Sequence, residues 1–105
     1  MKEWKVKYSP KAYADLKGIH SFIIENYQST KSAENVINRL RQSIKDLSFM
    51  ADAYHHYQDE PYYSKGVRYY SEGKYCIFYE YDDETVTVLR IINGKRDLTT
   101  ALAEC

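Results

Sequence analysis

The chain has 105 residues, of which 44% are hydrophobic and 29% are charged. A chain of this length forms one small domain, and its composition argues against intrinsic disorder. Its 15 basic and 15 acidic side chains balance, whereas a domain that binds nucleic acid through phosphate contacts usually carries a basic excess. No apolar run approaches the roughly 18 residues that a spanning helix needs, and the charged start does not resemble a secretory signal. The sequence therefore predicts a single cytoplasmic domain over residues 1–105, with no membrane contact.

Cysteine is rare in the chain and tyrosine is frequent, and each count bears on a different kind of site. Cys76 and Cys105 are the only cysteines, so the sequence offers neither a disulfide framework nor a zinc spacing, and no metal or cofactor is expected. Tyrosine is frequent, with 12 residues in the chain, and most of them fall between Tyr54 and Tyr81. Tyrosines could form a base-stacking platform or a half-exposed sheet face that a protein partner covers. We favour the second interpretation.

The first half of the chain predicts a strand followed by a helix. Residues Trp4–Tyr8 alternate between apolar and charged side chains, as a short strand does. Ser9 is a preferred N-cap, and Pro10 suits the first position of a helix, which we expect to run to about Tyr27. One face of that helix is apolar, formed by Ala12, Leu16, Ile19 and Ile23.

A second helix follows after a short polar break at residues 28–31. Its apolar stripe predicts an end near Ala51. Because so short a connection forces the chain to turn back, the two helices should form an antiparallel hairpin on a sheet. The stripe consists of Ala33, Ile37, Leu40, Ile44 and Leu47.

The second half predicts an antiparallel meander. Residues 52–66 show no clear period and are expected to form a long loop. Glu72-Gly73 should be a two-residue hairpin turn, and Asp97 should cap a last short helix. The fold class is therefore α+β, a two-layer sandwich. The expected elements are strands Val67–Ser71, Lys74–Tyr81 and Val86–Ile92 and the helix Leu98–Ala103.

Three stretches resemble the RelE/ParE superfamily of bacterial toxins from type II toxin–antitoxin systems. Val6–Leu16 is similar to its opening strand and first helix. Gly66–Arg68 and Gly73–Tyr79 resemble its glycine–arginine strand and the tyrosine-rich strand that follows, and Val88–Asp97 resembles its last strand and basic turn. The resemblance implies a toxin neutralised by a cognate antitoxin that wraps around it. It also implies that operator DNA is contacted only through the antitoxin.

One branch of the superfamily cleaves mRNA on the ribosome. Such a nuclease needs cations to stabilise the charge on the phosphorane and groups that move protons. By resemblance, Arg68 and Arg96 are the catalytic candidates if the chain is a nuclease. Two other positions depart from that branch, because Cys76 replaces an arginine and Leu102 replaces a tyrosine. The histidines at 55 and 56 could serve as a substitute acid–base set, although exposed loop histidines are the simpler interpretation.

The other branch, which is ParE-like, acts on DNA gyrase and has no established acid–base set. Balanced charge and the ending Val88–Asp97 favour this branch, so whether the chain is an enzyme stays open. Here Arg68, Arg90 and Arg96 would be structural or contact residues, and strand parity places Arg90 on the face of Val88 and Ile92, where Glu80 could pair with it. A third hypothesis is a non-toxic protein that only binds its antitoxin and acts as a co-repressor.

The expected partners are therefore an antitoxin and either gyrase or the ribosome with its mRNA. A sheet edge can accept an antitoxin segment as an added strand. Tyr69, Tyr75 and Tyr81, together with Arg90, are the predicted partner-binding residues. The predicted core consists of Leu16, Ile19, Ile23, Ile37, Leu40, Ile44, Ile77, Val88 and Ile91.

Overall fold

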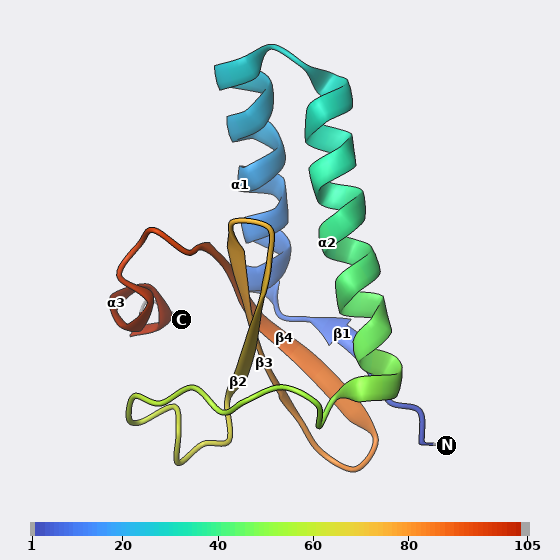
Figure 1. The fold of residues 1–105 in the computed structure, drawn as a ribbon, viewed down its shortest axis with the longest axis vertical. Coiled ribbons are helices and arrows are strands. Elements are labelled where there is room, and N and C mark those ends of the chain that lie inside the picture. The colour runs from blue at the N-terminus through green and yellow to red at the C-terminus, as the bar shows by residue number, and fades with distance from the viewer. Residues whose placement is uncertain (1, 104–105) are drawn as a thin grey trace.

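A four-stranded sheet carries a helical hairpin on one face (Figure 1). The computed structural model describes residues 2–103, so Cys105 lies outside the described residues. The α+β arrangement and the order of its elements are as predicted. These elements are β1 (Lys5–Tyr8), α1 (Pro10–Tyr27), α2 (Thr30–Met50), β2 (Arg68–Glu72), β3 (Tyr75–Tyr81), β4 (Thr85–Asn93) and α3 (Leu98–Ala103).

Helix α1 begins and ends where the sequence predicts. The Ser9 hydroxyl accepts a hydrogen bond from the amide of Ala12 at 3.0 Å, and Pro10 occupies the first turn. Gln28 ends the helix in the left-handed conformation, with φ of 50°. Ser29 then caps α2 by accepting a hydrogen bond from the amide of Ser32. Two capped ends separated by so short a connection produce the hairpin.

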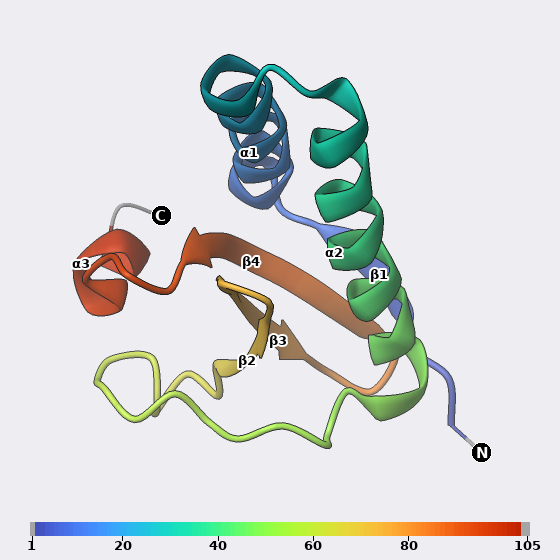
Figure 2. The same cartoon turned by 45° about the horizontal axis from the view of Figure 1, so that its top comes forward.

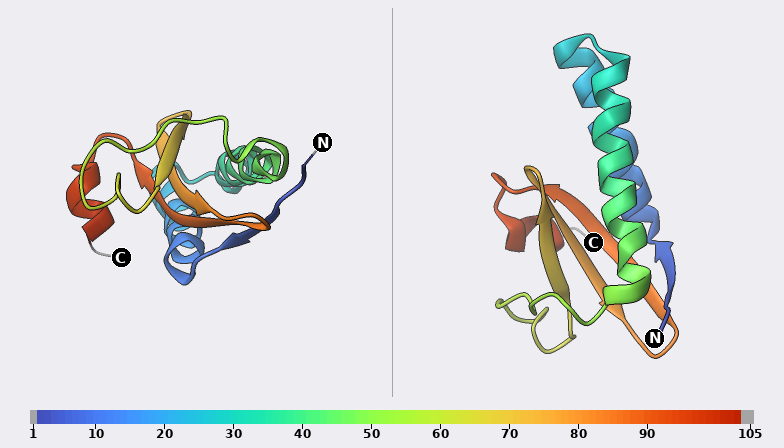
Figure 3. Two further views of the ribbon diagram at one scale, coloured as in Figure 1. Left: turned by 90° about the horizontal axis from the view of Figure 1, so that it is seen from below. Right: turned by 45° about the vertical axis from the view of Figure 1, so that its right-hand side comes forward.

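The hairpin is longer than the sheet that it covers. The halves of α1 and α2 nearest their connection project past the strands (Figures 1 and 3). Leu16, Leu40 and Ile44 lie over the sheet and are buried. Ile19 and Ile37, which were predicted to be buried, are only partly buried. Each of them lines a surface hollow beside α1.

The sheet order is β1-β4-β3-β2. The last three strands form the predicted antiparallel meander, whereas β1 pairs in parallel with β4, and Val6 lies beside Val86. The β2–β3 turn is one residue later than predicted, because Glu72 already pairs with Tyr75. Gly73 supplies the positive φ, +60°, that such a tight turn requires.

A β-bulge in β4 changes which side chains face the helices. Phe78 pairs with Arg90 and the next residue, Tyr79, pairs with Val88, so Leu89 is an extra residue. Val88 therefore faces the hairpin, while Arg90 lies on the opposite face of the sheet with Phe78. The prediction that Arg90 lies on the same face of the sheet as Val88 is wrong for this reason. The prediction that Arg90 lies on the same face as Ile92 is correct.

The chain itself covers the second face of the sheet. Helix α3 and the long loop before β2 lie on the side away from the hairpin (Figures 2 and 3). The loop is fastened to α3 by Thr99, whose hydroxyl donates to Asp59 and hydrogen-bonds Tyr57 at 2.8 Å. The apolar cluster beneath them contains Val67, Cys76, Phe78, Ile92, Ala101 and Leu102, with Tyr57, Tyr62, Tyr69, Leu89 and Leu98 packed against it.

Candidate partner-binding site

Arg68 holds the long loop at the start of β2. Its guanidinium donates hydrogen bonds to the carbonyl oxygens of Tyr54 and Asp52, the latter at 3.4 Å. It also lies 5.3 Å from the centre of the Tyr81 ring, a cation–π distance. Burial raises the pKa of Tyr79, and the nearby Arg68 charge partly offsets that effect. Arg68 thus makes structural contacts with the loop and with β3.

Arg96 lies at the other end of the sheet. It is exposed and follows the end of β4, where Asn93 pairs with Tyr75. Arg68, in contrast, pairs with Tyr79. Tyr75 and Tyr79 are four positions apart on β3, which corresponds to about 13 Å along the strand. The structure therefore does not bring the two catalytic candidates together into one cation site.

Cys76 and Leu102, the two positions at which the sequence departs from the nuclease branch, lie in an apolar environment. Cys76 and Leu102 are buried in the cluster on the second face of the sheet, with 8% and 2% of their surfaces exposed. His55 and His56 are exposed in the loop beside β2, and the His56 ring lies against Tyr63. Arg96 lines a hollow beside α1, and the lining of that hollow includes none of these four side chains.

Arg90 lies inside the fold. Only 6% of its surface is exposed, and its guanidinium donates two hydrogen bonds to the carboxylate of Asp15, at 2.8 and 3.0 Å. A further donor of Arg90 reaches the carbonyl oxygen of Ala101 in α3 at 2.8 Å. The expected pairing with Glu80 is wrong, because the bulge and the approach of α1 bring Asp15 to the guanidinium instead. Such a side chain connects α1, β4 and α3 and presents little surface to a partner.

The three predicted partner tyrosines do not share a surface. Tyr69 is half-buried on the second face and stacks on Phe78 at 5.9 Å between ring centres. Tyr81 faces the hairpin side, where its ring meets Trp4 edge-on. Tyr75 also faces the hairpin side but lies at the opposite end of β3 from Tyr81. Of the three, Tyr75 alone stands beside the hollows described next.

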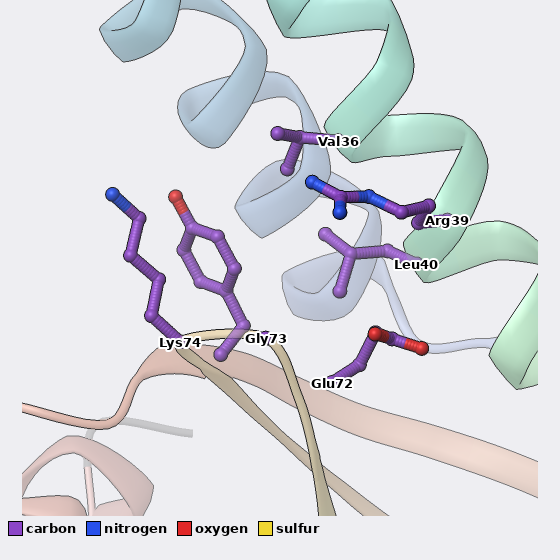
Figure 4. Close-up of a pocket in the computed structure, with 7 residues that line it drawn as sticks. Val36, Arg39, Leu40, Glu72, Gly73 and Lys74 are labelled. Carbon is purple, nitrogen blue, oxygen red and sulfur yellow. The ribbon is translucent and has the colours of Figure 1, made fainter.

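Tyr75 lines two hollows beneath the projecting part of the hairpin. One hollow lies between α2 and the β2–β3 turn and is shown in Figure 4, where Val36 and Leu40 of α2 face Glu72 and Lys74. The second has a volume of about 480 Å³ and lies between α1 and the end of β4. We call these two hollows together the Tyr75 groove. The second hollow is lined by Ala14, Asp15, Gly18, Ile19, Phe22, Tyr75, Ile91, Ile92, Asn93, Lys95 and Arg96.

The Tyr75 groove combines an apolar lining with cations. Phe22 contributes an exposed aromatic ring, with 53% of its surface accessible. Lys95 and Arg96 belong to the larger hollow, and Arg39 and Lys74 to the smaller one. A groove of this kind suits a segment that has apolar anchors and acidic side chains. Sequence reasoning did not identify Phe22 and Arg39 as site residues, because it could not show how far the hairpin extends beyond the sheet.

The edge of β2 is only partly open to an added strand. The amide of Tyr69 donates to the carbonyl oxygen of His55 at 3.1 Å, and the amide of Tyr57 donates to that of Val67 at 2.8 Å. The loop therefore pairs with the Arg68 end of β2. The expected addition of a partner strand is limited to the end of β2 near Ser71 or to the other edge of the sheet.

Comparisons with known proteins identify the family. The family model described as the ParE toxin of the type II toxin–antitoxin system, parDE, matches residues 6–98. No curated protein matches the sequence. The fold is similar to a chain of the chromosomal ParDE system from P. aeruginosa, with a TM-score of 0.76, 19% identity and coverage of 89% of this chain and 98% of that one. It is also similar to a chain of the RelBE2 toxin–antitoxin complex from Mycobacterium tuberculosis, with a TM-score of 0.60, 20% identity and coverage of 89% and 93%.

The family match extends over nearly all of the chain, from β1 to the first residue of α3. It covers the capped helix α1, the meander and the basic turn after β4, which are the stretches on which the resemblance was based. None of the helices within residues 2–103 is both long and apolar enough to cross a membrane. The chain belongs to the family of ParE toxins of type II toxin–antitoxin systems.

Proposed function

We propose that this chain is a growth-inhibiting toxin that poisons DNA gyrase and is neutralised by a cognate antitoxin bound in the Tyr75 groove. The observation that carries the choice of target is the separation of the arginines. Arg68 is engaged with the loop at one end of the sheet, and Arg96 lies at the other. A nuclease needs its cations and proton carriers around one phosphate.

The surroundings of Cys76 and Leu102, the other two positions compared with the nuclease branch, also support gyrase as the target. Cys76 and Leu102 are packed in an apolar cluster, where neither side chain stabilises a developing negative charge. The match to the ParE family model agrees with a target other than mRNA. A toxin that acts by binding a protein needs surface complementarity rather than an acid–base set.

The lining of the Tyr75 groove supports the proposed position of the antitoxin. Both solved relatives come from systems in which a toxin is paired with an antitoxin. The groove offers an apolar lining that includes Ile19 and Phe22 and cations that include Lys95 and Arg96. An acidic amphipathic antitoxin segment would bury the apolar side chains and pair with the cations.

The target is tested by measuring two activities on the same purified chain. Gyrase is incubated with plasmid DNA and the chain, and linear DNA released after protease treatment reports trapped, cut DNA. In parallel, translating ribosomes are incubated with the chain, and the mRNA is mapped for new 5′ ends. We expect linear DNA to accumulate and the mRNA to stay intact.

Two controls make this result decisive. Addition of the cognate antitoxin should suppress the linear DNA, and an Arg96→Ala variant separates the two mechanisms. A nuclease would lose its cleavage of mRNA in that variant, because the lost cation would stabilise charge in the transition state. Cleavage of mRNA by the unmodified chain, without any trapped gyrase, would overturn the proposal.

A further inference from the structure

Another hollow lies where the start of α1, the long loop and α3 approach one another. Its volume is about 490 Å³, close to the volume of about 480 Å³ of the larger hollow in the Tyr75 groove. The linings of this hollow and of the Tyr75 groove have no residue in common. We call it the Leu89 hollow, and the lining residues used below are Lys11, Tyr62, Lys65, Val67, Glu80, Leu89 and Leu102.

The lining of the Leu89 hollow is largely apolar. Val67 and Leu102 are buried, each with 2% of its surface exposed. Leu89 is the extra residue of the bulge in β4, and it is only partly buried against the cluster on the second face of the sheet. A bulge can redirect a side chain out of the regular alternation of a strand. It leaves an apolar side chain here that gains from burial against a partner.

Hydrogen bonds hold two walls of the Leu89 hollow in place. The amide of Ser9, just before α1, donates to the carbonyl oxygen of Val88 at 2.9 Å, and the Ser9 hydroxyl donates to that of Leu89 at 2.9 Å. On the loop side, the amide of Val67 donates to the carbonyl oxygen of Tyr62 at 3.0 Å. A hollow that is already formed lowers the entropic cost of binding a partner.

Charges of both signs stand around the apolar lining. Lys11 of α1 and Lys65 of the loop contribute cations, Glu80 of β3 contributes a carboxylate, and all three residues are exposed. The phosphates of a nucleic acid would be repelled by Glu80 and would leave the apolar lining uncovered. A folded protein can bring an apolar side chain together with charges that complement this rim. The hollow therefore suits a protein partner better than a nucleic acid.

We propose that the Leu89 hollow is the surface with which this chain binds gyrase. An apolar side chain of gyrase would fill the hollow beside Leu89, and a carboxylate next to it would pair with Lys65. Side chains that fill preformed pockets supply most of the binding energy in many protein interfaces. This inference rests on the proposed function and deepens it, because it names the part of the chain that contacts the target.

Helix α1 places the surface for the antitoxin next to the Leu89 hollow. Lys11 lines the Leu89 hollow, and Asp15 lines the larger hollow of the Tyr75 groove. Four residues of an α-helix correspond to a rise of about 6 Å. An antitoxin segment in the Tyr75 groove would therefore border the Leu89 hollow and obstruct a partner as large as gyrase. Neutralisation would then need no overlap between the two linings.

Binding of the full chain to immobilised gyrase tests the inference. Leu89→Glu places a carboxylate in the apolar lining and should weaken the affinity for gyrase by about tenfold or more. Lys65→Glu reverses one cation of the rim and should weaken it by about threefold or more. Surface plasmon resonance measures both affinities, and the linear DNA released in the gyrase assay should fall in the same order. Because Lys65 is exposed in the loop, its variant keeps the test valid if Leu89→Glu does not fold.

Each variant has a matched control outside the hollow. Phe49→Glu also replaces an apolar side chain by a carboxylate, at a position of α2 with 56% of its surface exposed. Lys31→Glu makes the same charge reversal as Lys65→Glu at an exposed position of α2. Both controls should keep the affinity for gyrase within about twofold. Circular dichroism and urea unfolding establish which variants are folded, and the folded variants should bind the antitoxin as the unmodified chain does.

Four outcomes would overturn the inference. If gyrase affinity is unchanged in the folded variants at Leu89 and Lys65, gyrase is bound by another surface, and the proposed function stands. Equal losses in the controls would mean that overall charge governs binding. Saturable binding of a DNA duplex alone, lost in Leu89→Glu, would assign the hollow to nucleic acid. If the unmodified chain does not bind gyrase at all, the proposed function is overturned together with this inference.

Discussion

Arg90 and Asp15 join the last strand to the first helix through two parallel hydrogen bonds of 2.8 and 3.0 Å. The same carboxylate accepts a hydrogen bond from the backbone amide of Ile91 at 2.9 Å. Because Arg90 also donates to Ala101, one buried ion pair connects α1, β4 and α3. Its contacts fix the position of α1, which forms one side of the larger hollow of the Tyr75 groove.

Removing one partner of this pair should destabilise the fold strongly. Asp15→Ala leaves the Arg90 guanidinium inside the fold without its carboxylate, and we expect a loss of about 3–5 kcal/mol in the free energy of unfolding. Urea unfolding followed by circular dichroism measures the change. Glu34→Ala, at an exposed position of α2, is the control and should stay within about 0.5 kcal/mol. A similarly small effect in Asp15→Ala would mean that the pair contributes little.

Leu40 tests the contact between α2 and the sheet. Only 1% of its surface is exposed, so Leu40→Ala should create a cavity and cost about 2–5 kcal/mol. The partly buried Ile37 should tolerate Ile37→Val with a smaller loss, because less of its surface is packed. Chemical denaturation of both variants under the same conditions gives the comparison. A loss below about 1 kcal/mol for Leu40→Ala would contradict the packing described here.

Alkaline pH should destabilise the chain through its buried tyrosines. Burial is the main cause that raises the pKa of both Tyr70 and Tyr79 in the folded state. Tyrosines of the unfolded chain have a pKa of about 10. The stabilising contribution of each is fully present below that unfolded pKa and is lost as the pH rises toward the folded pKa. The free energy of unfolding should therefore fall above about pH 10, by up to about 1.4 kcal/mol per pH unit for each tyrosine.

Phenylalanine variants identify the source of that slope. The double variant Tyr70→Phe, Tyr79→Phe should be less stable at neutral pH, because Tyr79 donates to the carbonyl oxygen of Ala51 and Tyr70 hydrogen-bonds Ser43. Above about pH 10 its stability should depend less on pH than that of the unmodified chain. Urea unfolding between pH values on either side of this point provides the test, and parallel curves for the two proteins would refute the assignment.

The two arginines should respond differently to truncation. Arg68→Ala removes the hydrogen bonds to the carbonyl oxygens of Tyr54 and Asp52, and we expect it to cost about 1.5–3 kcal/mol. Arg96→Ala alters an exposed side chain beyond the end of β4 and should cost less. Comparing their unfolding midpoints checks the order. If Arg96→Ala were the more destabilising of the two, the structural role would belong to Arg96 instead.

Antitoxin binding should depend on the side chains that line the Tyr75 groove. Phe22→Ala removes an exposed ring from the Tyr75 groove and should lower antitoxin affinity by about tenfold or more. Tyr63→Ala is a matched control, because its ring is exposed to a similar degree, 55% against 53%, but lies in the loop. Calorimetry with the purified antitoxin measures both. Equal effects of the two substitutions would remove the Tyr75 groove as the main binding surface.

The bounds of α1 and α3 could be predicted from sequence because local chemistry determines them. Ser9 and Pro10 define the start of α1, and Asp97 accepts a hydrogen bond from the amide of Thr100 at the start of α3. The partner of Arg90 could not be predicted in this way. The bulge at Leu89 changes the face on which Arg90 lies, and Asp15 is distant in sequence.

The candidate site could be predicted only in part for a related reason. Tyr75 was correctly placed on a strand, but neither of the two hollows that it lines is visible in any local pattern. Their shape depends on how far the hairpin projects past the sheet. Likewise, the separation of Arg68 from Arg96 depends on the register of β2 against β3 and of β3 against β4, in which one residue of difference alters every pair.

The parallel pairing of β1 with β4 has a consequence for the order in which the protein can be assembled. Val6 cannot find Val86 until most of the chain has been synthesised, whereas the hairpin and the meander rely on contacts between neighbours in sequence. Contacts between distant parts of a chain form slowly, because the intervening segment must first be closed into a loop. A nascent chain that ends before Thr85 therefore lacks the neighbour that holds β1, and Ser9, which caps α1, has yet to meet the carbonyl oxygen of Leu89 that accepts its hydroxyl. The first strand to be made is thus the last to be fixed in place.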